Sequence, residues 1–301
     1  MDTLVKSRLK IADLPMSLPH PGPELVETVR SHATRLETRW EDRRTVWHGW
    51  GEGEPLVLLH GGSGSWTHWI HNVLPLAASG RQVLAADMPG CGDSDPPATG
   101  GDADALVEPL AAGLRDLLGA RAFDLVGFSF GGLVAGLMAA QVPGAIRRLV
   151  LVGAPVLPLA GRPVRLLDWR HLPESEQRDV HRANLQAMML HHGASITDLA
   201  IDVHAANVAR DRLRRRRLSR TDALARALQQ VHCPLAALYG RHDVLYRDRL
   251  REIEATLDAL PVLQSRTAID AAGHWVQFEA PDAFNTALSR TLDAMPSAWP
   301  L

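Results

Sequence analysis

Cysteine is scarce in this sequence, and its scarcity excludes two common ways of stabilising a fold. Among 301 residues only Cys91 and Cys233 are cysteines, far apart and outside any C-x-x-C pattern. A disulfide framework or a zinc site needs several cysteines or histidines at short spacings. We therefore interpret both as reduced thiols and expect no metal ion. No phosphate-binding glycine fingerprint is present either, so we expect no cofactor.

Long apolar runs are also lacking. No stretch approaches the roughly 20 apolar residues that span a bilayer. The first ten residues, MDTLVKSRLK, have no apolar core of the kind found in signal peptides. The sequence therefore predicts no membrane association and a cytoplasmic location.

Neither sign of charge is in excess. The chain has 32 Lys and Arg against 34 Asp and Glu, a formal net charge of -2, so nothing favours long-range attraction to nucleic acid. The local exception is the run Arg214 to Arg217. Consecutive residues on a helix point in different directions, so we expect most of these four side chains to face solvent.

The sequence does contain short apolar runs that alternate with longer helical patterns. Six runs are typical of strands: 55–60, 82–86, 123–127, 149–152, 235–239 and 261–267. Because they are apolar nearly throughout, they indicate a parallel sheet covered on both faces. Amphipathic stretches such as 105–118 and 247–260 indicate the covering helices. The predicted fold class is α/β, with a mostly parallel, doubly wound sheet.

Two segments depart from this alternation. Residues 156–231 hold no convincing strand and are bounded by prolines, which predicts an inserted helical cap. Residues 1–40 carry several prolines and one helical pattern, 24–37, and we interpret them as an extension packed on the core. Residues 41–155 and 232–301 then form the core.

The stretch 124–141, DLVGFSFGGLVAGLMAAQ, places one serine where an apolar strand meets a helix of small residues. Ser129 with Gly127 and Gly131 matches G-x-S-x-G, in which the chain turns so sharply that bulky flanking residues would clash. The motif alone also fits a plain Gly/Ser-rich turn. Its position at the end of a predicted strand favours a serine nucleophile.

A glycine loop follows the strand 55–60. It reads HGGSGS from His60, and the backbone N–H of Gly62, with that of Phe130 after the serine, is suited to stabilise an oxyanion. The alternative is a flexible glycine turn. We expect His60 to hold this loop by hydrogen bonding.

Two further residues complete a candidate triad. Asp243 follows the strand 235–239, and His274 follows the last strand. A serine hydroxyl is a poor nucleophile, so an imidazole must take its proton while a carboxylate orients the imidazole. The order Ser129, Asp243, His274 is the one expected for an α/β architecture. Asp270 is a rival carboxylate.

Together these motifs resemble those of the α/β-hydrolase-fold enzymes. The matching segments are HGGSGSW (60–66), DMPGCGDSD (87–95), GFSFGG (127–132), GRHD (240–243) and GHWVQFEAPDAFN (273–285). The resemblance implies an α/β-hydrolase fold with a Ser-His-Asp site and structural roles for Asp93 and Ser94. The haloalkane dehalogenases and epoxide hydrolases of this fold carry aspartate as nucleophile, so Ser129 argues against both.

Within that fold, the tail is similar to the meta-cleavage product hydrolases, in which the histidine is followed by Trp, Gln and Glu and later by Phe-Asn. The matching residues are Trp275, Gln277, Glu279, Phe284 and Asn285. The glycine loop is similar but reads Gly-Ser-Gly-Ser where that family more often has Gly-Pro-Gly-Ala. The resemblance implies hydrolysis of a carbon–carbon bond in 2-hydroxy-6-oxo-dienoates. The alternatives are a carboxylesterase or lactonase of small esters and a non-catalytic ligand-binding protein of the same fold.

The substrate is expected to be a small molecule that binds beneath the cap. A dienoate carboxylate needs a cation, and the cap offers Arg165, Arg210 and Arg212 besides the arginine run. The candidate pocket residues are Ser63, Trp66, Asn207, Arg210 and Trp275. Trp69 and Trp169 are further candidates, and ordinary core packing is the alternative for every tryptophan. The oligomeric state is left open, a homo-oligomer included.

Overall fold

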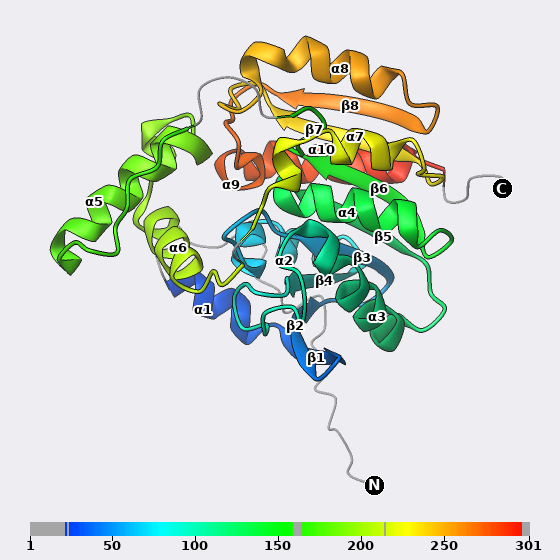
Figure 1. The fold of residues 1–301 in the computed structure, drawn as a ribbon, viewed down its shortest axis with the longest axis horizontal. Helices are drawn as coiled ribbons and strands as arrows, with labels where there is room; N and C mark the ends of the chain where they lie inside the picture. The colour runs from blue at the N-terminus through cyan, green and yellow to red at the C-terminus, as the bar shows by residue number, and fades with distance from the viewer. Residues whose placement is uncertain (1–21, 23, 159–163, 214, 297–301) are drawn as a thin grey trace, which may run out of the picture.

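A computed structural model describes residues 22, 24–158, 164–213 and 215–296 (Figure 1). In this part of the chain, a twisted sheet of eight strands has the order β1-β2-β4-β3-β5-β6-β7-β8. The strands are β1 (Thr34–Trp40), β2 (Arg43–Trp50), β3 (Glu54–Leu59), β4 (Arg81–Asp87), β5 (Phe123–Phe128), β6 (Ile146–Val152), β7 (Leu235–Gly240) and β8 (Leu263–Ile269). Strand β2 is antiparallel to both of its neighbours, and the other pairs are parallel.

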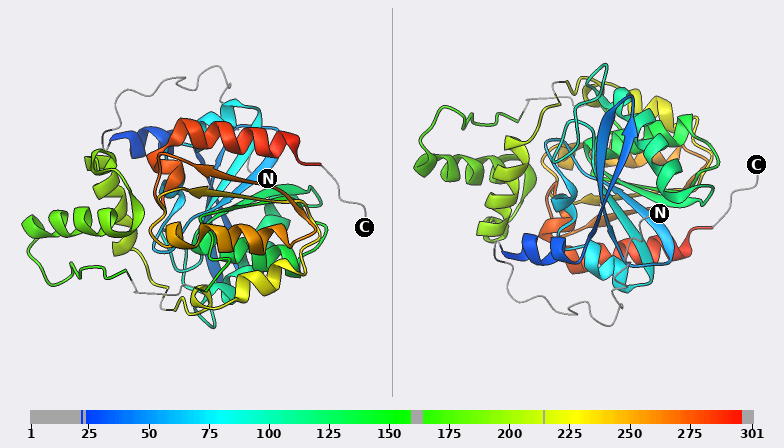
Figure 2. Two further views of the ribbon diagram at one scale, coloured as in Figure 1. Left: turned by 90° about the horizontal axis from the view of Figure 1, so that it is seen from above. Right: turned by 90° about the horizontal axis from the view of Figure 1, so that it is seen from below.

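Helices cover both faces of this sheet (Figures 1 and 2). The α-helices of the described residues, the two outside the sheet (α5 and α6) included, are α1 (Glu24–Ser31), α2 (Val73–Ala78), α3 (Val107–Leu118), α4 (Phe130–Gln141), α5 (Glu174–Asn184), α6 (Asp198–Ala209), α7 (Ala223–Leu228), α8 (Leu250–Asp258), α9 (Val276–Glu279) and α10 (Pro281–Ala294). Alternate residues of β3 enter different cores. Val57 and Leu59 pack with α3, α4, α7 and α8, whereas Leu56 and Leu58 pack with α1, α2 and α10. Burial on both sides explains why the central strands are apolar nearly throughout.

The six predicted strands are confirmed as β3 to β8. The prediction for the N-terminal segment is wrong in part, because the helix α1 ends at Ser31 and residues 34–40 form the edge strand β1. The β1–β2 turn is closed by Glu41 and Asp42, with φ of 46° and 60°. Two positive φ values match the twist of a two-residue hairpin. Residues 1–21 and 23 lie outside the described residues.

Between β6 and β7, the described residues hold helices and turns but no strand. Helices α5 and α6 project beyond the sheet as a cap (Figures 1 and 2). The predicted cap extends too far, because α7 packs on α4 in the core. A Cβ built on Gly136 of α4 would lie 2.3 Å from Cδ1 of Leu224.

The described part of the arginine run, Arg215 to Arg217, is not on an α-helix, contrary to our expectation. Residues 215–217 follow α6 in an irregular segment, and Arg214 lies outside the described residues. Backbone N–H groups of this segment donate to the core. Arg212 bonds the Gly90 carbonyl at 2.8 Å, and Arg215 bonds that of Gly101 at 3.2 Å.

Candidate active site

Ser129 lies at the joint between β5 and α4, in a backbone conformation that few non-glycine residues adopt. Its φ of 51° and ψ of -116° turn the chain abruptly from strand to helix. Its N–H donates to the Val152 carbonyl at 2.7 Å, which ties the turn to β6. Backbone strain of this kind costs on the order of 1–3 kcal/mol and persists only where the surroundings hold it. The predicted strand-to-helix turn at Ser129 is therefore present.

The flanking glycines are required by close backbone approaches. A Cβ built on Gly127 would lie 2.4 Å from the Gly131 carbonyl oxygen. One built on Gly131 would lie 2.3 Å from the carbonyl oxygen of His60. Both distances are far below van der Waals contact, so the G-x-S-x-G spacing reflects packing of the turn against the loop after β3.

Asp243 and His274 reach Ser129 from the loops after β7 and β8. His274 Nε2 lies 2.9 Å from Ser129 Oγ, and its Nδ1 lies 2.7 Å from Oδ2 of Asp243. The other carboxylate oxygen accepts the Leu245 N–H at 3.0 Å. Because a carboxylate only accepts, Nδ1 carries a proton and Nε2 is left to accept one from the serine. Asp243 is 0% and His274 3% exposed, so bulk water competes little for these bonds.

The rival carboxylate, Asp270, lies outside this chain of hydrogen bonds. It is exposed and forms an ion pair with Arg241 at the surface. The structure brings Asp243, and not Asp270, to the imidazole of His274.

The loop after β3 brings Gly62 beside the first residue of α4. A Cβ built on Gly62 would lie 3.7 Å from the Phe130 Cβ, and both residues line the cavity at Ser129. As the first helical residue, Phe130 has no acceptor for its N–H within α4. Within the described residues, neither N–H takes part in a hydrogen bond. Both are therefore available to an oxygen atom bound at Ser129.

Two buried histidines hold the peptide groups of Gly61 in this loop. His60 Nε2 accepts the Met88 N–H at 3.0 Å, so its Nδ1 donates to the Gly61 carbonyl at 2.7 Å. His68 Nδ1 accepts the Gly61 N–H at 3.2 Å. Burial lowers the pKa of His60 to about 4 and that of His68 well below its usual range, so both rings are neutral. His60 holds the loop as expected, and His68 is a second support that the sequence did not indicate.

A cavity of about 920 Å³ opens onto Ser129 and His274. The other residues that line it are Gly61, Gly62, Ser63, Phe128, Phe130, Pro155, Val164, Leu166, Met188, Met189, Arg215, Arg216, Arg217, Ser219, Arg220, Val244, Leu245 and Tyr246. Four of them are arginines, and none of these described lining residues is an aspartate or glutamate. The cavity therefore suits an anionic molecule with an apolar body.

Arg216 is the half-buried member of this group, whereas Arg215, Arg217 and Arg220 are exposed at the mouth. Its guanidinium carbon lies 5.5 Å from the Phe130 ring centre. Its Nε is buried without a hydrogen-bond partner in the described structure and lies 3.1 Å from a Cβ built on Gly62. The expectation that most of the run faces solvent agrees with the exposed Arg215 and Arg217, and Arg216 is the one described member that the irregular backbone turns inward.

Among the predicted pocket residues, Ser63 lines the cavity, but none of the four tryptophans does. Trp66, Trp69 and Trp275 are fully buried in the core on the α2 and α10 side. The Trp275 indole N–H donates to the His68 carbonyl at 2.9 Å. Trp169 packs against His181 on the cap. The alternative of ordinary core packing therefore holds for Trp66, Trp69 and Trp275, whereas Trp169 is half-buried on the cap and lies in neither core nor cavity lining.

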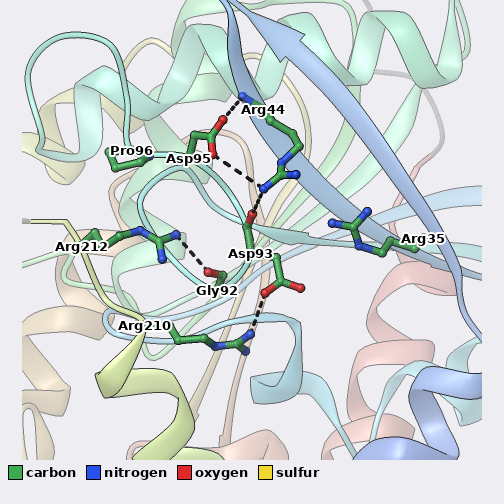
Figure 3. Close-up of a pocket in the computed structure, with 8 residues that line it drawn as sticks. All are labelled: Arg35, Arg44, Gly92, Asp93, Asp95, Pro96, Arg210 and Arg212. Carbon is green, nitrogen blue, oxygen red and sulfur yellow. Dashed lines mark hydrogen bonds and ion pairs between the residues drawn. The ribbon is translucent and has the colours of Figure 1, made fainter.

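Asn207 and Arg210 also lie away from the cavity. Their side chains instead bond residues of the core, which joins the cap to it. The Asn207 side-chain oxygen accepts the Ser65 hydroxyl at 2.7 Å and is buried. Arg210 Nη1 lies 2.7 Å from Asp93 Oδ1, in a separate surface pocket of about 330 Å³ (Figure 3). Arg212 lines that pocket too and donates to the Gly92 carbonyl at 3.0 Å (Figure 3).

The cysteines take no part in this arrangement. Both are free, and burial raises the pKa of the Cys91 and Cys233 thiols to about 12, which disfavours the reactive thiolate. In the described ranges, no three His, Cys, Asp or Glu side chains are grouped to hold a metal ion. No helix among those same residues is long and apolar enough to cross a membrane.

Residues 54–281 match the family described as alpha/beta hydrolase fold. The chain belongs to the α/β hydrolase fold family. It is 31% identical over 255 residues to a 2-hydroxy-6-oxononadienedioate/2-hydroxy-6-oxononatrienedioate hydrolase of Cupriavidus pinatubonensis (strain JMP 134 / LMG 1197), which covers 77% of this chain and 84% of that protein. A 2-hydroxy-6-oxononadienedioate/2-hydroxy-6-oxononatrienedioate hydrolase 1 of Dechloromonas aromatica (strain RCB) is 27% identical over 285 residues, 87% of this chain and 94% of that one.

A solved structure has a similar fold over most of the chain. The meta-cleavage product hydrolase from Pseudomonas fluorescens IP01 has a TM-score of 0.69 at 23% identity, over 86% of this chain and 97% of that chain. At that identity the likeness supports the fold alone. The curated relatives confirm the resemblance to the meta-cleavage product hydrolases that the motifs indicated.

Proposed function

We propose that this α/β hydrolase is a serine hydrolase in which Ser129 attacks the substrate, His274 transfers the proton and Asp243 orients His274. The observation that carries the proposal is the continuous chain of hydrogen bonds from Asp243 through His274 to Ser129, with both distances below 3.0 Å. The N–H groups of Gly62 and Phe130 stabilise the oxyanion that forms when the serine adds to a carbonyl.

The substrate is an acid, and we place its carboxylate near Arg216. Four arginines and no acidic side chain occur among the described lining residues, so positive charge predominates there even though Asp211, just outside the lining, pairs with Arg216. Arginine also presents a planar donor fork that matches a carboxylate. The curated relatives are named for hydrolysis of dienedioates and trienedioates, which are acids. This agreement supports a 2-hydroxy-6-oxo-dienoate as substrate.

The proposed reaction has three stages, the last two of which take place at Ser129. His274 first helps the dienol become its keto form, and Ser129 then adds to the distal carbonyl while Nε2 takes its proton. Collapse of the adduct breaks the neighbouring carbon–carbon bond, returns the proton to the leaving carbon and leaves an acyl ester on Ser129. Water activated by His274 hydrolyses this ester and releases the second acid.

Two substrates and two proteins test the proposal. The visible absorbance of a 2-hydroxy-6-oxo-dienoate is followed beside release of p-nitrophenol from a short ester, with wild type and Ser129→Ala. We expect rapid dienoate decay, slow ester turnover, and loss of both in Ser129→Ala by about 10³-fold or more. The matched control is Ser175→Ala, which removes an exposed hydroxyl of the cap helix α5.

Each other outcome has a definite meaning. Fast ester cleavage with an intact dienoate would identify a carboxylesterase or lactonase that uses the same triad. Inertness toward both substrates, with the fold retained, would favour a ligand-binding protein. Undiminished turnover in Ser129→Ala would overturn the assignment of the nucleophile.

A further inference from the structure

A side chain outside the catalytic chain joins the His274 loop to the cap. Glu279 ends α9, and its Oε2 accepts the Gly273 N–H at 2.7 Å. Its Oε1 accepts the His192 N–H at 2.7 Å, and both oxygens lie within 3.0 Å of the His191 backbone nitrogen. Gly273 directly precedes His274, whereas 191 and 192 belong to the cap. One carboxylate therefore bridges the two segments through three backbone donors.

The same two segments touch on the other side of His274. The Trp275 N–H donates to the Met189 carbonyl at 2.8 Å. A Cβ built on Gly273 would lie 2.9 Å from the His191 backbone nitrogen, so the cap leaves no room for a side chain there. Met188 and Met189 line the cavity at Ser129. The cap segment that lines the cavity is thus fastened to the loop that carries the imidazole.

We propose that Glu279 is a positioning residue, which clamps the His274 loop to the cap and so keeps the imidazole aligned between Asp243 and Ser129. This inference rests on the proposed roles of Ser129 and His274. Hydrogen bonds to a carboxylate are roughly twice as strong as those between neutral groups, and two oxygens are needed to serve donors on opposite sides. In Glu279→Gln, an NH2 group replaces one oxygen and faces N–H donors, so one side of the clamp opens.

The test measures the reactivity of Ser129 without reference to the natural substrate. A fluorophosphonate forms an Oγ–P bond on an activated serine with loss of fluoride, while the histidine takes the hydroxyl proton. We expect phosphonylation of Ser129 to slow at least about 10-fold in Glu279→Gln, because small misplacements of catalytic groups are costly. Turnover of whichever substrate the wild type accepts should show the same loss in kcat, with KM within about 2-fold. Glu108→Gln, an exposed ion-pair partner of Arg115 on α3, is the matched control and should react like wild type.

A second variant reaches the clamp from the other side. Gly273→Ala keeps the Glu279 carboxylate but inserts a methyl group 2.9 Å from the His191 nitrogen and 3.2 Å from Glu279 Oε2, and we expect a similar loss of reactivity. The double variant should lose less reactivity than the product of the two single fold-losses, because both substitutions disrupt the same contact between the His274 loop and the cap.

The outcomes separate this inference from the function it rests on. If wild type is not phosphonylated at Ser129, the proposed function fails. If wild type reacts and both folded variants, judged by the midpoint of thermal unfolding, react at its rate with unchanged kcat, the function stands and the clamp is overturned. Should Glu279→Gln fail to fold, Gly273→Ala alone decides in the same way.

Discussion

Arg216 and Asp211 form an ion pair in which one guanidinium nitrogen, Nη2, lies 2.8 and 2.7 Å from the two carboxylate oxygens. The same carboxylate accepts the Ser63 hydroxyl at 2.6 Å, so it links the segment after α6 to the glycine loop after β3. Asp211 therefore holds Arg216 beside Gly62 and Phe130. Its negative charge offsets part of the arginine's positive charge. The ion pair also fixes the orientation of the other N–H donors of the guanidinium.

Replacing Arg216 should impair hydrolysis of acids selectively. A hydrogen bond to a charged group contributes about 1.5–3 kcal/mol, so we expect Arg216→Gln to lower kcat/KM for the dienoate about 10- to 100-fold. A neutral p-nitrophenyl ester lacks the carboxylate and should lose less than about 3-fold. Arg226→Gln, which removes an exposed arginine of α7, serves as the control. Equal losses on the two substrates would mean that Arg216 does not recognise the carboxylate.

A methyl group at Gly131 should destabilise the protein. The new Cβ would lie 2.3 Å from the His60 carbonyl oxygen and 2.5 Å from that of Leu59, both backbone atoms that cannot move aside. Overpacking of this kind costs about 1–3 kcal/mol or more. Gly193→Ala is the control, because a Cβ there meets nothing within 4 Å. Urea unfolding of the two variants tests the prediction, and equal midpoints would contradict it.

The contribution of His60 to stability should depend on pH. Burial lowers its pKa in the folded protein to about 4, below the 6.5 of an exposed histidine, so the unfolded chain binds the extra proton in that interval. The contribution is therefore complete above about pH 6.5 and is lost as the pH falls toward 4. The gap in unfolding free energy between wild type and His60→Gln should narrow by about 2 kcal/mol from about pH 7 to about pH 5. Urea titrations at both values measure it, and parallel curves would show that His60 is not buried in its neutral form.

Trp275 should affect stability rather than substrate choice. Its indole N–H bonds the buried His68 carbonyl, and its ring lies outside the cavity lining. Trp275→Phe leaves that carbonyl without its donor, at a cost of about 1–3 kcal/mol. We expect the ratio of dienoate to ester turnover to stay within about 2-fold of wild type. A large shift in that ratio would place the indole in the substrate pocket after all.

The central sheet could be predicted because each of its strands is recognisable from its own run of apolar residues. A strand such as Leu56 to Leu59 is buried on both faces, so apolarity persists along it. Strands β1 and β2 lack that signature. Strand β1 is an edge strand and most of its side chains reach solvent, whereas β2 contains polar residues as well as apolar ones. Their hairpin turn, Glu41 and Asp42, adopts positive φ without the Asn or Gly that usually mark such a turn. The edge hairpin was therefore missed.

The convergence of Ser129, Asp243 and His274 could be predicted because each residue sits in a local motif at the end of a strand. The cavity lining could not, because it depends on contacts between distant segments. Ser63 and Asp211 meet across 148 positions, and nothing near either residue in the sequence indicates the other. The one sequence feature that could have indicated an inward-facing arginine is Asp211, the acid shortly before the arginine run. An acid there allows one guanidinium to be neutralised and turned inward while its neighbours remain in water.

The irregular segment after α6 is held to the core chiefly through its main chain. The N–H groups of Arg212, Arg215 and Arg217 donate to Gly90, Gly101 and the Asp102 carboxylate. The path of the segment therefore does not depend on which side chains it carries at 215 and 217. Substitutions at these positions can alter the charge and width of the cavity mouth while leaving the framework in place. New substrate preferences can arise here without a stability penalty that must be repaired elsewhere.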